Sequence, residues 1–329
     1  LMSEAVRGEG GYLLNNKGER FMANYAPSKM ELAPRDVVAK AIETEIAEGR
    51  GFGKGLDAYV VADVRHLPKE VILEKLHGIR ELAITFEHAD PLTQPIPIRP
   101  TCHYSMGGID VVDYKSCGTV VPGLFAAGEA ACVSVHGANR LGGNSLADAV
   151  VFGKVAGEGA VAYVAEHSQA DAKQALDDAA KYWENRFTEV TSRKDGRPIA
   201  EIRDEMANAM WNKVGIFREE SKMQEALATI NKLIEEYKTC YVGDTNRTFN
   251  MAFVNYVEVG SLLTVAKAVV MGALRRQESR GSHLREDYTK RDDAKFLNHT
   301  LITLKEDGEY EVGQRDVVVT RFEPKERTY

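Results

Sequence analysis

The sequence has few cysteines and no long run of basic residues, and both absences exclude classes of function. Four cysteines occur in 329 residues, and none belongs to a Cys-x-x-Cys pair. This spacing indicates neither a structural zinc site nor a disulfide framework. The formal net charge of −7 argues against nucleic acid as a partner. We therefore expect reduced thiols, no metal site and no nucleic-acid interface.

The sequence also lacks a Gly-x-Gly-x-x-Gly string, the phosphate-binding loop of dinucleotide-binding domains. The nearest glycine clusters are residues 8–11 and 49–53, and neither has the third glycine at the required offset. The chain therefore contains no recognisable start of such a domain.

Long apolar segments are rare, and one of them is a candidate for a membrane-spanning helix. Residues 251–274 are mostly apolar and long enough to cross a bilayer. Polar residues recur every three positions along this segment: Asn255, Glu258, Ser261, Thr264 and Lys267. Two charges in mid-segment are costly in lipid, so we predict a long amphipathic helix of a bundle.

The length of the chain predicts two or three domains. Pro34 and the apolar residues that follow it predict an amphipathic helix that stops at Gly49. Residues 91–100 are rich in proline, so we expect an extended connection between domains there. Residues 104–165 read as short strands and a turn at residues 122–123, followed by a helix that starts near Ser145. That helix carries small apolar residues suited to tight packing, which are Ala147, Val150, Val151, Val155, Ala156 and Ala160.

From about residue 170 the apolar pattern becomes helical. A seam with the spacing 4-3-4-3 predicts one packed helix, and it comprises Met223, Leu227, Ile230, Ile234 and Tyr237. The helix before it is expected to carry Met206, Met210, Trp211 and Phe217. Near the end, residues 300–304 and 317–319 flank Asp307-Gly308, which predicts a β-hairpin.

Two short blocks rich in glycine and polar residues lie between residues 100 and 146. Residues 100–108 read PTCHYSMGG and residues 136–146 read HGANRLGGNSL, while residues 122–129 between them read PGLFAAGE. Glycine lets a backbone approach a flat cofactor closely, and the histidine and arginine suit a small anion.

These blocks resemble the flavoprotein subunit of succinate dehydrogenase and quinol:fumarate reductase. Further matches lie at residues 7–15, 18–22, 35–39 and 278–283, in the same order as in that subunit. The resemblance implies an α/β flavoprotein fold in which an α+β substrate-capping domain and part of an FAD-binding domain precede a C-terminal helical bundle and a small β-containing tail. The implied boundaries are 1–103 for the capping domain, 104–165 for the C-terminal part of the FAD-binding domain, 166–280 for the helical domain and 281–329 for the small C-terminal domain. Because the phosphate loop is missing, we expect the C-terminal part of a larger flavoprotein, with an incomplete capping domain.

The resemblance assigns residues to a dicarboxylate substrate. His103 and Arg140 match positions that contact one substrate carboxylate. Ser3 and Glu4 match the pair at the other end, where serine replaces the family's threonine. An arginine supplies a planar fork that fits a carboxylate.

Arg35 matches the residue that exchanges the substrate proton, while hydride passes between the flavin and the adjacent carbon. The resemblance implies a proton relay through Glu4, Arg7 and Arg35. An arginine acid is less unusual at this position because Arg35 lies in the first turn of a helix, where the dipole disfavours positive charge. Without the resemblance, Arg35 and Asp36 would read as an ordinary surface pair.

FAD is the implied cofactor. Glu129 matches an acidic residue that accepts from the ribose hydroxyls, and the backbone N–H groups of Asn144, Ser145 and Leu146 are expected at the flavin edge. The phosphate loop and the histidine that attaches the flavin covalently have no match in this chain. We therefore expect the 329 residues alone to be catalytically inactive and free of flavin.

The implied partners are an iron–sulfur subunit and one or more membrane anchor subunits of a respiratory complex. The implied location is peripheral, on the cytoplasmic face of the inner membrane. L-Aspartate oxidase is an alternative within the same family, and adenylylsulfate reductase is a more distant one. A fragment that is inactive without the missing N-terminal half is a third alternative. The direction of the physiological reaction stays open.

Overall fold

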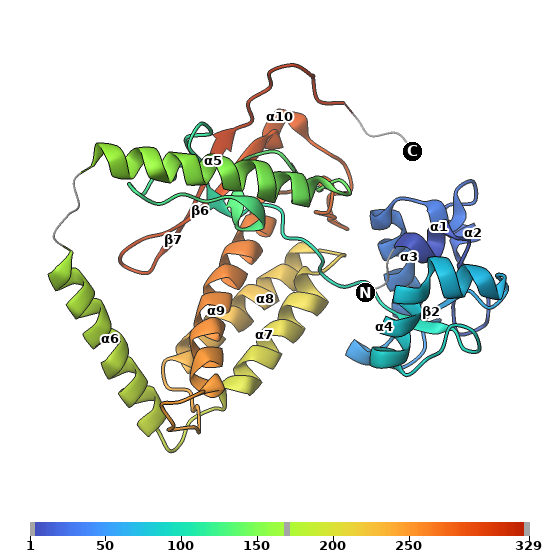
Figure 1. Cartoon of the computed structure of the whole chain (residues 1–329), viewed down its shortest axis with the longest axis horizontal. Coiled ribbons are helices and arrows are strands. Elements are labelled where there is room, and N and C mark those ends of the chain that lie inside the picture. The colour runs from blue at the N-terminus through green and yellow to red at the C-terminus, as the bar shows by residue number, and fades with distance from the viewer. Residues whose placement is uncertain (1–3, 168–171, 326–329) are drawn as a thin grey trace. The chain divides into compact units, whose positions relative to one another are not determined.

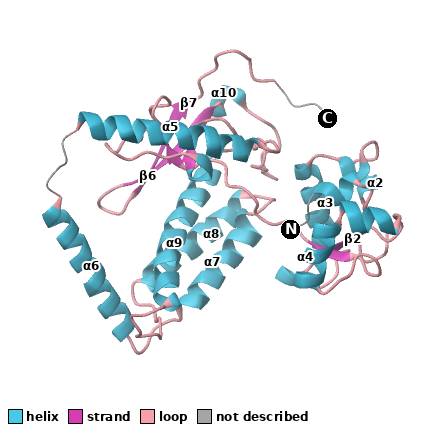
Figure 2. Ribbon diagram, viewed as in Figure 1, coloured by secondary structure: helices cyan, strands magenta, loops and turns pink. Residues whose placement is uncertain are grey.

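The computed structural model describes residues 4–167 and 172–325. The chain divides into two units, residues 1–103 and 104–329, and each is described by itself. The elements are labelled in Figure 1, and Figure 2 separates helices, strands and loops. The four domains implied by the resemblance stay a prediction.

The first unit is built on a small antiparallel sheet in the order β1-β2-β3. Tyr12 pairs with Asp63, and Val60 pairs with Ile98. Helix α3 packs on β2 and helix α4 on β3, which gives one core. Its regular elements are α1 (Glu4–Gly8), β1 (Tyr12–Leu14), α2 (Met22–Tyr25), η1 (Met30–Leu32), α3 (Arg35–Ala47), η2 (Gly55–Asp57), β2 (Val60–Asp63), η3 (Val71–Lys75), α4 (His77–Glu87) and β3 (Ile96–Ile98).

Helix α3 forms where the sequence predicts a helix. Pro34 precedes it with a φ of −53°, a value that proline fixes and that suits a helix start. The apolar face buries Val38, Ala41 and Ile42 in the core of this unit. Arg35 is therefore the first residue of a well-anchored helix.

The proline-rich segment differs from its prediction. Instead of an extended connection between domains, it contributes strand β3 to the sheet of the first unit. Proline lacks the N–H that a central strand needs, but β3 lies at the edge of the sheet, where Pro97 is tolerated. The proline content of this segment predicted an extended backbone, but it could not predict that the backbone pairs with β2.

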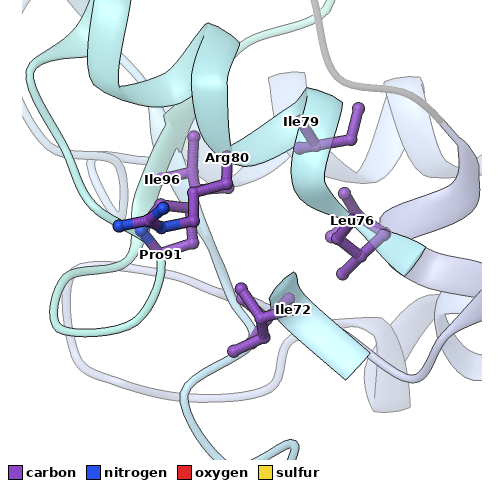
Figure 3. A pocket seen from close by; sticks show the side chains of 8 residues that line it. Ile72, Leu76, Ile79, Arg80, Pro91 and Ile96 are labelled. Carbon is purple, nitrogen blue, oxygen red and sulfur yellow. The ribbon is translucent and has the colours of Figure 1, made fainter. Parts of the chain in front are cut away.

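Close to this strand, the first unit has a small apolar hollow (Figure 3). Ile72, Leu76 and Ile79 line it from η3 and α4, and Pro91 and Ile96 line the other side. The Arg80 guanidinium binds Asp90 at 2.6 Å, so the one charged group at the hollow is already paired. The hollow belongs to the hydrophobic core and has no converging polar groups for a ligand.

The second unit begins with two short parallel strands, in which Ile109 pairs with Ala131. A long helix, three packed helices and a hairpin follow. Its regular elements are β4 (Ile109–Asp110), η4 (Gly128–Ala130), β5 (Ala131–Cys132), α5 (Asn144–Glu166), α6 (Lys173–Ser192), α7 (Ile199–Val214), α8 (Glu220–Tyr237), α9 (Met251–Arg275), α10 (Asp293–Phe296), β6 (Asn298–Leu304) and β7 (Tyr310–Asp316).

Helix α5 starts where expected, but its small apolar residues do not all pack. Val155 and Ala156 contact the core around Val111, whereas Val150 and Val151 are 72% and 54% exposed. Only one side of the helix is covered by described residues. The sequence showed an apolar helix and could not show which side is covered.

Helices α7, α8 and α9 lie side by side in Figure 1 and pack against one another. The predicted seam of α8 is confirmed, because Met223 and Ile230 are fully buried. Phe217 was wrongly assigned to α7, which ends at Val214 before the turn at Gly215. Among the described helices, α9 is the one with the length and composition of a membrane span, and its buried residues pack in this bundle.

The C-terminal hairpin forms, but its second strand lies earlier than expected. Asn298 pairs with Asp316 and Leu304 with Tyr310, so residues 317–319 follow the strand. The loop closes through a bond from the Lys305 N–H to the Glu309 carbonyl at 2.9 Å. Because this bond closes the loop, β7 begins at Tyr310. Its last residue, Asp316, pairs with Asn298, which is the first residue of β6.

Candidate functional site

In the first unit, three of the predicted site residues lie together. The Arg35 Nε and Nη2 donate to Glu4 Oε2 at 2.9 Å and 2.6 Å. Arg7 Nη2 lies 3.5 Å from Glu4 Oε1. Glu4 therefore bridges two arginines, one on its own helix α1 and one at the start of α3.

The three residues differ in exposure and electrostatic surroundings. The side chains of Glu4 and Arg35 are 56% and 54% exposed, whereas that of Arg7 is 11% exposed. Hydrogen bonds from Arg35 lower the pKa of Glu4, so this carboxylate stays ionised. Burial lowers the pKa of Arg7, and the nearby Arg35 lowers it further while Glu4 opposes the shift. The surroundings of Arg7 thus favour its neutral form more than water does.

Arg7 also fixes the chain just before Arg35. Its Nη1 donates to the carbonyls of Glu31 and Ala33, the latter at 3.0 Å. Since Ala33 precedes the Pro34 that starts α3, these bonds join α1 to the start of α3. The pair of Glu4 and Arg35 therefore rests on a fixed backbone.

In the second unit, Arg140 lies over an aromatic ring. Its Cζ is 4.8 Å from the ring centroid of Tyr104. The Tyr104 hydroxyl donates to Asp148 Oδ2 at 3.2 Å, and His136 Nε2 donates to the same oxygen at 2.9 Å. The His136 and Tyr104 rings meet edge to face, with centroids 5.3 Å apart.

Sequence reasoning missed two residues of this cluster, Tyr104 and Asp148. Asp148 is buried on α5, with 1% of its side chain exposed. A carboxylate buried without bonds is costly, and here two donors share one of its oxygens. A lone aspartate in an apolar helix was the available signal, but its partners lie 12 and 44 residues away.

The predicted flavin-contacting residues surround the start of α5. Gly143 precedes the helix with a φ of +82°, and no side chain caps the helix end. At Gly142 and Gly143, an added Cβ would meet no heavy atom within 4 Å. Glu129 Oε1 accepts the backbone N–H of Ser105 at 2.8 Å, so this carboxylate holds the segment that follows His103.

The remaining predicted residues are placed as follows. Ser3 lies outside the described residues. His103 is exposed and is the last residue of the first unit. Asn144 and Leu146 are exposed at the start of α5, and Ser145 between them is half-buried. The structure thus groups Glu4 with Arg7 and Arg35, and it places Arg140, Glu129 and the start of α5 in the second unit.

Known families match both ends of the chain. Residues 1–146 match the FAD binding domain, and residues 203–329 match the family described as fumarate reductase flavoprotein C-term. The 8-methylmenaquinol:fumarate reductase flavoprotein subunit of Wolinella succinogenes is 52% identical, over 100% of this chain and 54% of the relative. The succinate dehydrogenase flavoprotein subunit of Coxiella burnetii is 44% identical, over 92% of this chain and 52% of the relative. The chain therefore spans about half the length of the curated relatives it matches.

A solved structure gives the same result. E. coli quinol fumarate reductase FrdA matches with a TM-score of 0.90 at 38% identity, and the match covers 99% of this chain and 57% of that one. Sequence and fold together confirm the resemblance seen in the short blocks, and with it the α/β flavoprotein fold. The chain belongs to the family of succinate dehydrogenase and fumarate reductase flavoprotein subunits.

Proposed function

We propose that this chain supplies substrate and flavin ligands of an FAD-dependent oxidoreductase that interconverts succinate and fumarate. The observation that carries the proposal is the ion pair of Arg35 and Glu4 with Arg7 beside it. It occurs in a chain 52% identical to a subunit named for fumarate reduction. An exposed pair of this kind can open to a ligand, while Arg7 keeps its place.

The start of α5 fits a flavin. The space at Gly142 and Gly143 lets a flat ring approach the backbone, and the positive end of a helix stabilises an anionic ring. Leu141 and Leu146 are 61% and 76% exposed, which offers apolar surface to such a ring.

The ligands follow from this fit. Backbone N–H groups of Asn144, Ser145 and Leu146 would hold the edge of the flavin ring, and Glu129 would accept from the ribose hydroxyls. The Asn144 and Leu146 N–H groups contact the Leu141 and Gly143 carbonyls at 3.2 Å, so these two would have to turn toward the ring. Bound FAD supplies the hydride exchange with the substrate.

The dicarboxylate would be held at both ends. Arg140 and His103 would bind one carboxylate, and Ser3 and Glu4 would lie at the other, where Ser3 would donate to it and the ionised Glu4 would act through the arginines that it binds. Arg140 Nε is buried and has no hydrogen-bond partner among the described residues, so a carboxylate oxygen that reached it would satisfy an N–H that is costly to leave unpaired.

Arg35 would donate or accept the substrate proton. Glu4 connects it to Arg7, since the same carboxylate contacts both guanidinium groups. Because its pKa is lowered by burial and by Arg35, Arg7 is suited to replace the proton that Arg35 gives up.

We further propose that electrons pass to or from an iron–sulfur subunit and a quinone. The holoprotein, which here means the complete flavoprotein with its FAD and partner subunits, would then lie on the cytoplasmic face of the inner membrane. Anchor subunits would bind it there. Two similar solved structures are those of quinol fumarate reductases, which supports partner subunits in general.

Two alternatives are an L-aspartate oxidase and a fragment that has no activity of its own. Both can be tested in one assay, in which succinate, fumarate and L-aspartate are offered separately to the holoprotein. Turnover of L-aspartate alone would contradict the proposal, and so would the absence of any turnover by the holoprotein.

The role of Arg35 is tested by Arg35→Lys in the FAD-loaded holoprotein. We expect turnover in both directions to fall by about 10²–10⁴-fold, the usual contribution of a positioned acid, with FAD content unchanged. Arg80→Lys is the matched control, because Arg80 also makes an ion pair through two hydrogen bonds, to Asp90, in the same unit. An Arg35→Lys variant that keeps more than about a tenth of the rate would overturn the assignment.

A further inference from the structure

The guanidinium of Arg140 rests on a surface that the proposed function does not use. Tyr104 presents its ring to Arg140 at 4.8 Å from the centroid, a distance at which a cation is attracted to the ring face. Arg140 Nη1 donates to the Leu141 carbonyl at 3.3 Å. The ring and this carbonyl together limit how the guanidinium can turn.

Tyr104 is itself held on two sides. Its hydroxyl donates to Asp148 Oδ2 at 3.2 Å, and the His136 ring meets it edge to face at an angle of 87°. His136 Nε2 also donates to Asp148 Oδ2. Three side chains from separate segments thus fix one another, and the buried carboxylate at the centre comes from the long helix α5.

The protonation state of Tyr104 supports this arrangement of Tyr104, His136 and Asp148. Burial raises the pKa of Tyr104, and the Asp148 carboxylate raises it further. The hydroxyl therefore stays protonated and keeps donating to Asp148 at physiological pH.

An arginine has much side-chain freedom to lose on binding a carboxylate. A ring that holds the guanidinium in advance removes part of that cost, which raises affinity without a new contact to the ligand. Asp148 and His136 are too deeply buried to serve as primary carboxylate ligands, with 1% and 10% of their side chains exposed.

We propose that Tyr104, fixed by Asp148 and His136, is a positioning residue that orients Arg140 toward a substrate carboxylate. This inference rests on the proposed function, because it takes Arg140 as a dicarboxylate ligand. It predicts that the aromatic face of residue 104 matters more than its hydroxyl.

The test compares Tyr104→Leu with Tyr104→Phe in the FAD-loaded holoprotein, with malonate as a nonreacting dicarboxylate. Tyr104→Leu should weaken malonate binding about 3- to 30-fold, the range of a cation–π contact. KM for fumarate should rise by a similar factor, while kcat at saturating fumarate changes less. Tyr104→Phe keeps the ring and should bind malonate within about threefold of wild type. Flavin absorbance reports both FAD content and malonate binding.

Two further variants complete the design. Tyr114→Leu is the matched control, because Tyr114 is another tyrosine beside an arginine in this unit, with its ring 6.0 Å from Arg315. Tyr104→Met serves if Tyr104→Leu loses flavin, because it is apolar and flexible but has no ring. Arg140→Ala measures what the whole arginine contributes to malonate binding.

The outcomes separate the two proposals. If Arg140→Ala weakens malonate binding and the ringless variants at residue 104 do not, Tyr104 does not position Arg140 and the proposed function stands. If Tyr104→Phe loses as much affinity as the ringless variants, the aromatic face is not responsible and the inference fails. If Arg140→Ala binds malonate like wild type, the assignment of Arg140 to the substrate fails as well.

Discussion

Buried charge in the second unit is concentrated around His283 and the segment that follows α9. Glu278 and Arg285 are fully buried, and Glu278 binds Arg276 at 2.6 Å and Arg280 at 2.8 Å. Arg218 Nη1 donates to His283 Nδ1 at 2.8 Å, and His283 Nε2 donates to the Arg276 carbonyl at 3.0 Å. His283 therefore has the hydrogen-bond pattern of a neutral imidazole.

This histidine makes the folded state sensitive to pH. Burial and the surrounding arginines together lower the pKa of His283 to about 4, although the hydrogen bond to the Arg276 carbonyl opposes the shift. In the unfolded chain the pKa is near 6.5, so protons bind more readily there. The neutral ring contributes its full stability above about pH 6.5, and this stability is lost as the pH falls toward 4, by up to about 1.4 kcal/mol per pH unit.

We expect His283→Gln to flatten this dependence. Glutamine offers an oxygen to Arg218 and an N–H to the Arg276 carbonyl but does not titrate. Urea unfolding at pH 7, 6 and 5 should show the free energy of unfolding falling faster in wild type than in the variant. Parallel curves for the two proteins would contradict the prediction, because the other titrating groups are shared.

The sequence predicted single site residues unevenly, for a physical reason. Short blocks made His103, Arg140 and Glu129 candidate site residues, because each lies in a local motif whose residues are contiguous. The partners of Arg140 could not be found this way, since Tyr104 and Asp148 meet only after the chain folds across 44 residues. Likewise, residues 278–283 were recognisable, while the contact of His283 with Arg218, 65 residues away, was not.

Among the helices and strands, the spacing of apolar residues predicted the buried face of a helix better than it predicted which strands pair. The helix after Pro34 and the seam of α8 are confirmed, because one apolar side determines each of them. Strand β3 was missed and β7 was expected too late, because strand pairing depends on a partner that lies elsewhere in the chain. In α5, half of the small apolar residues named from the sequence are exposed, which composition cannot reveal.

The packing of α8 on α9 depends on a glycine that has no room for a side chain. A Cβ at Gly260 would lie 2.5 Å from Tyr237 Oη and 2.7 Å from its Cζ. Tyr237 cannot simply swing away, because its hydroxyl donates to the Tyr256 carbonyl at 3.0 Å and its ring stacks on Tyr256 at 4.6 Å. Gly260→Ala should therefore destabilise the protein by about 1–3 kcal/mol, as overpacking usually does.

Gly272 on the same helix supplies the control. A Cβ there would meet Thr300 Cγ2 at 3.8 Å, an ordinary contact. Alanine forms helices better than glycine, by about 0.5–1 kcal/mol, so Gly272→Ala should raise the thermal midpoint while Gly260→Ala lowers it. Equal shifts for the two variants would show that helix propensity, and not the contact with Tyr237, decides the outcome at Gly260.

At the scale of the whole molecule, helix α9 bears on the proposed peripheral attachment to a membrane. Helix α9 is long and apolar enough to span one, and exposed Leu262, Val265 and Val269 extend its apolar character beyond the bundle. Its other side is buried against α7 and α8, with Val259 and Val270 fully covered. A bundle helix tolerates charge on its exposed side alone, whereas a lipid-spanning helix tolerates it nowhere near its middle.

Two lysine substitutions near the middle of α9 separate these cases. Val265 is 58% exposed and Val259 is fully buried. In a bundle helix, Val265→Lys should change stability by less than about 0.5 kcal/mol. Val259→Lys should cost about 4 kcal/mol or more, because it buries an unpaired charge. Thermal melts of the purified holoprotein measure both effects, and alkaline carbonate extraction of cell membranes should release wild type and Val265→Lys alike. If Val265→Lys were as damaging as Val259→Lys and wild type resisted extraction, α9 would have to lie in lipid and the proposed peripheral attachment would be wrong.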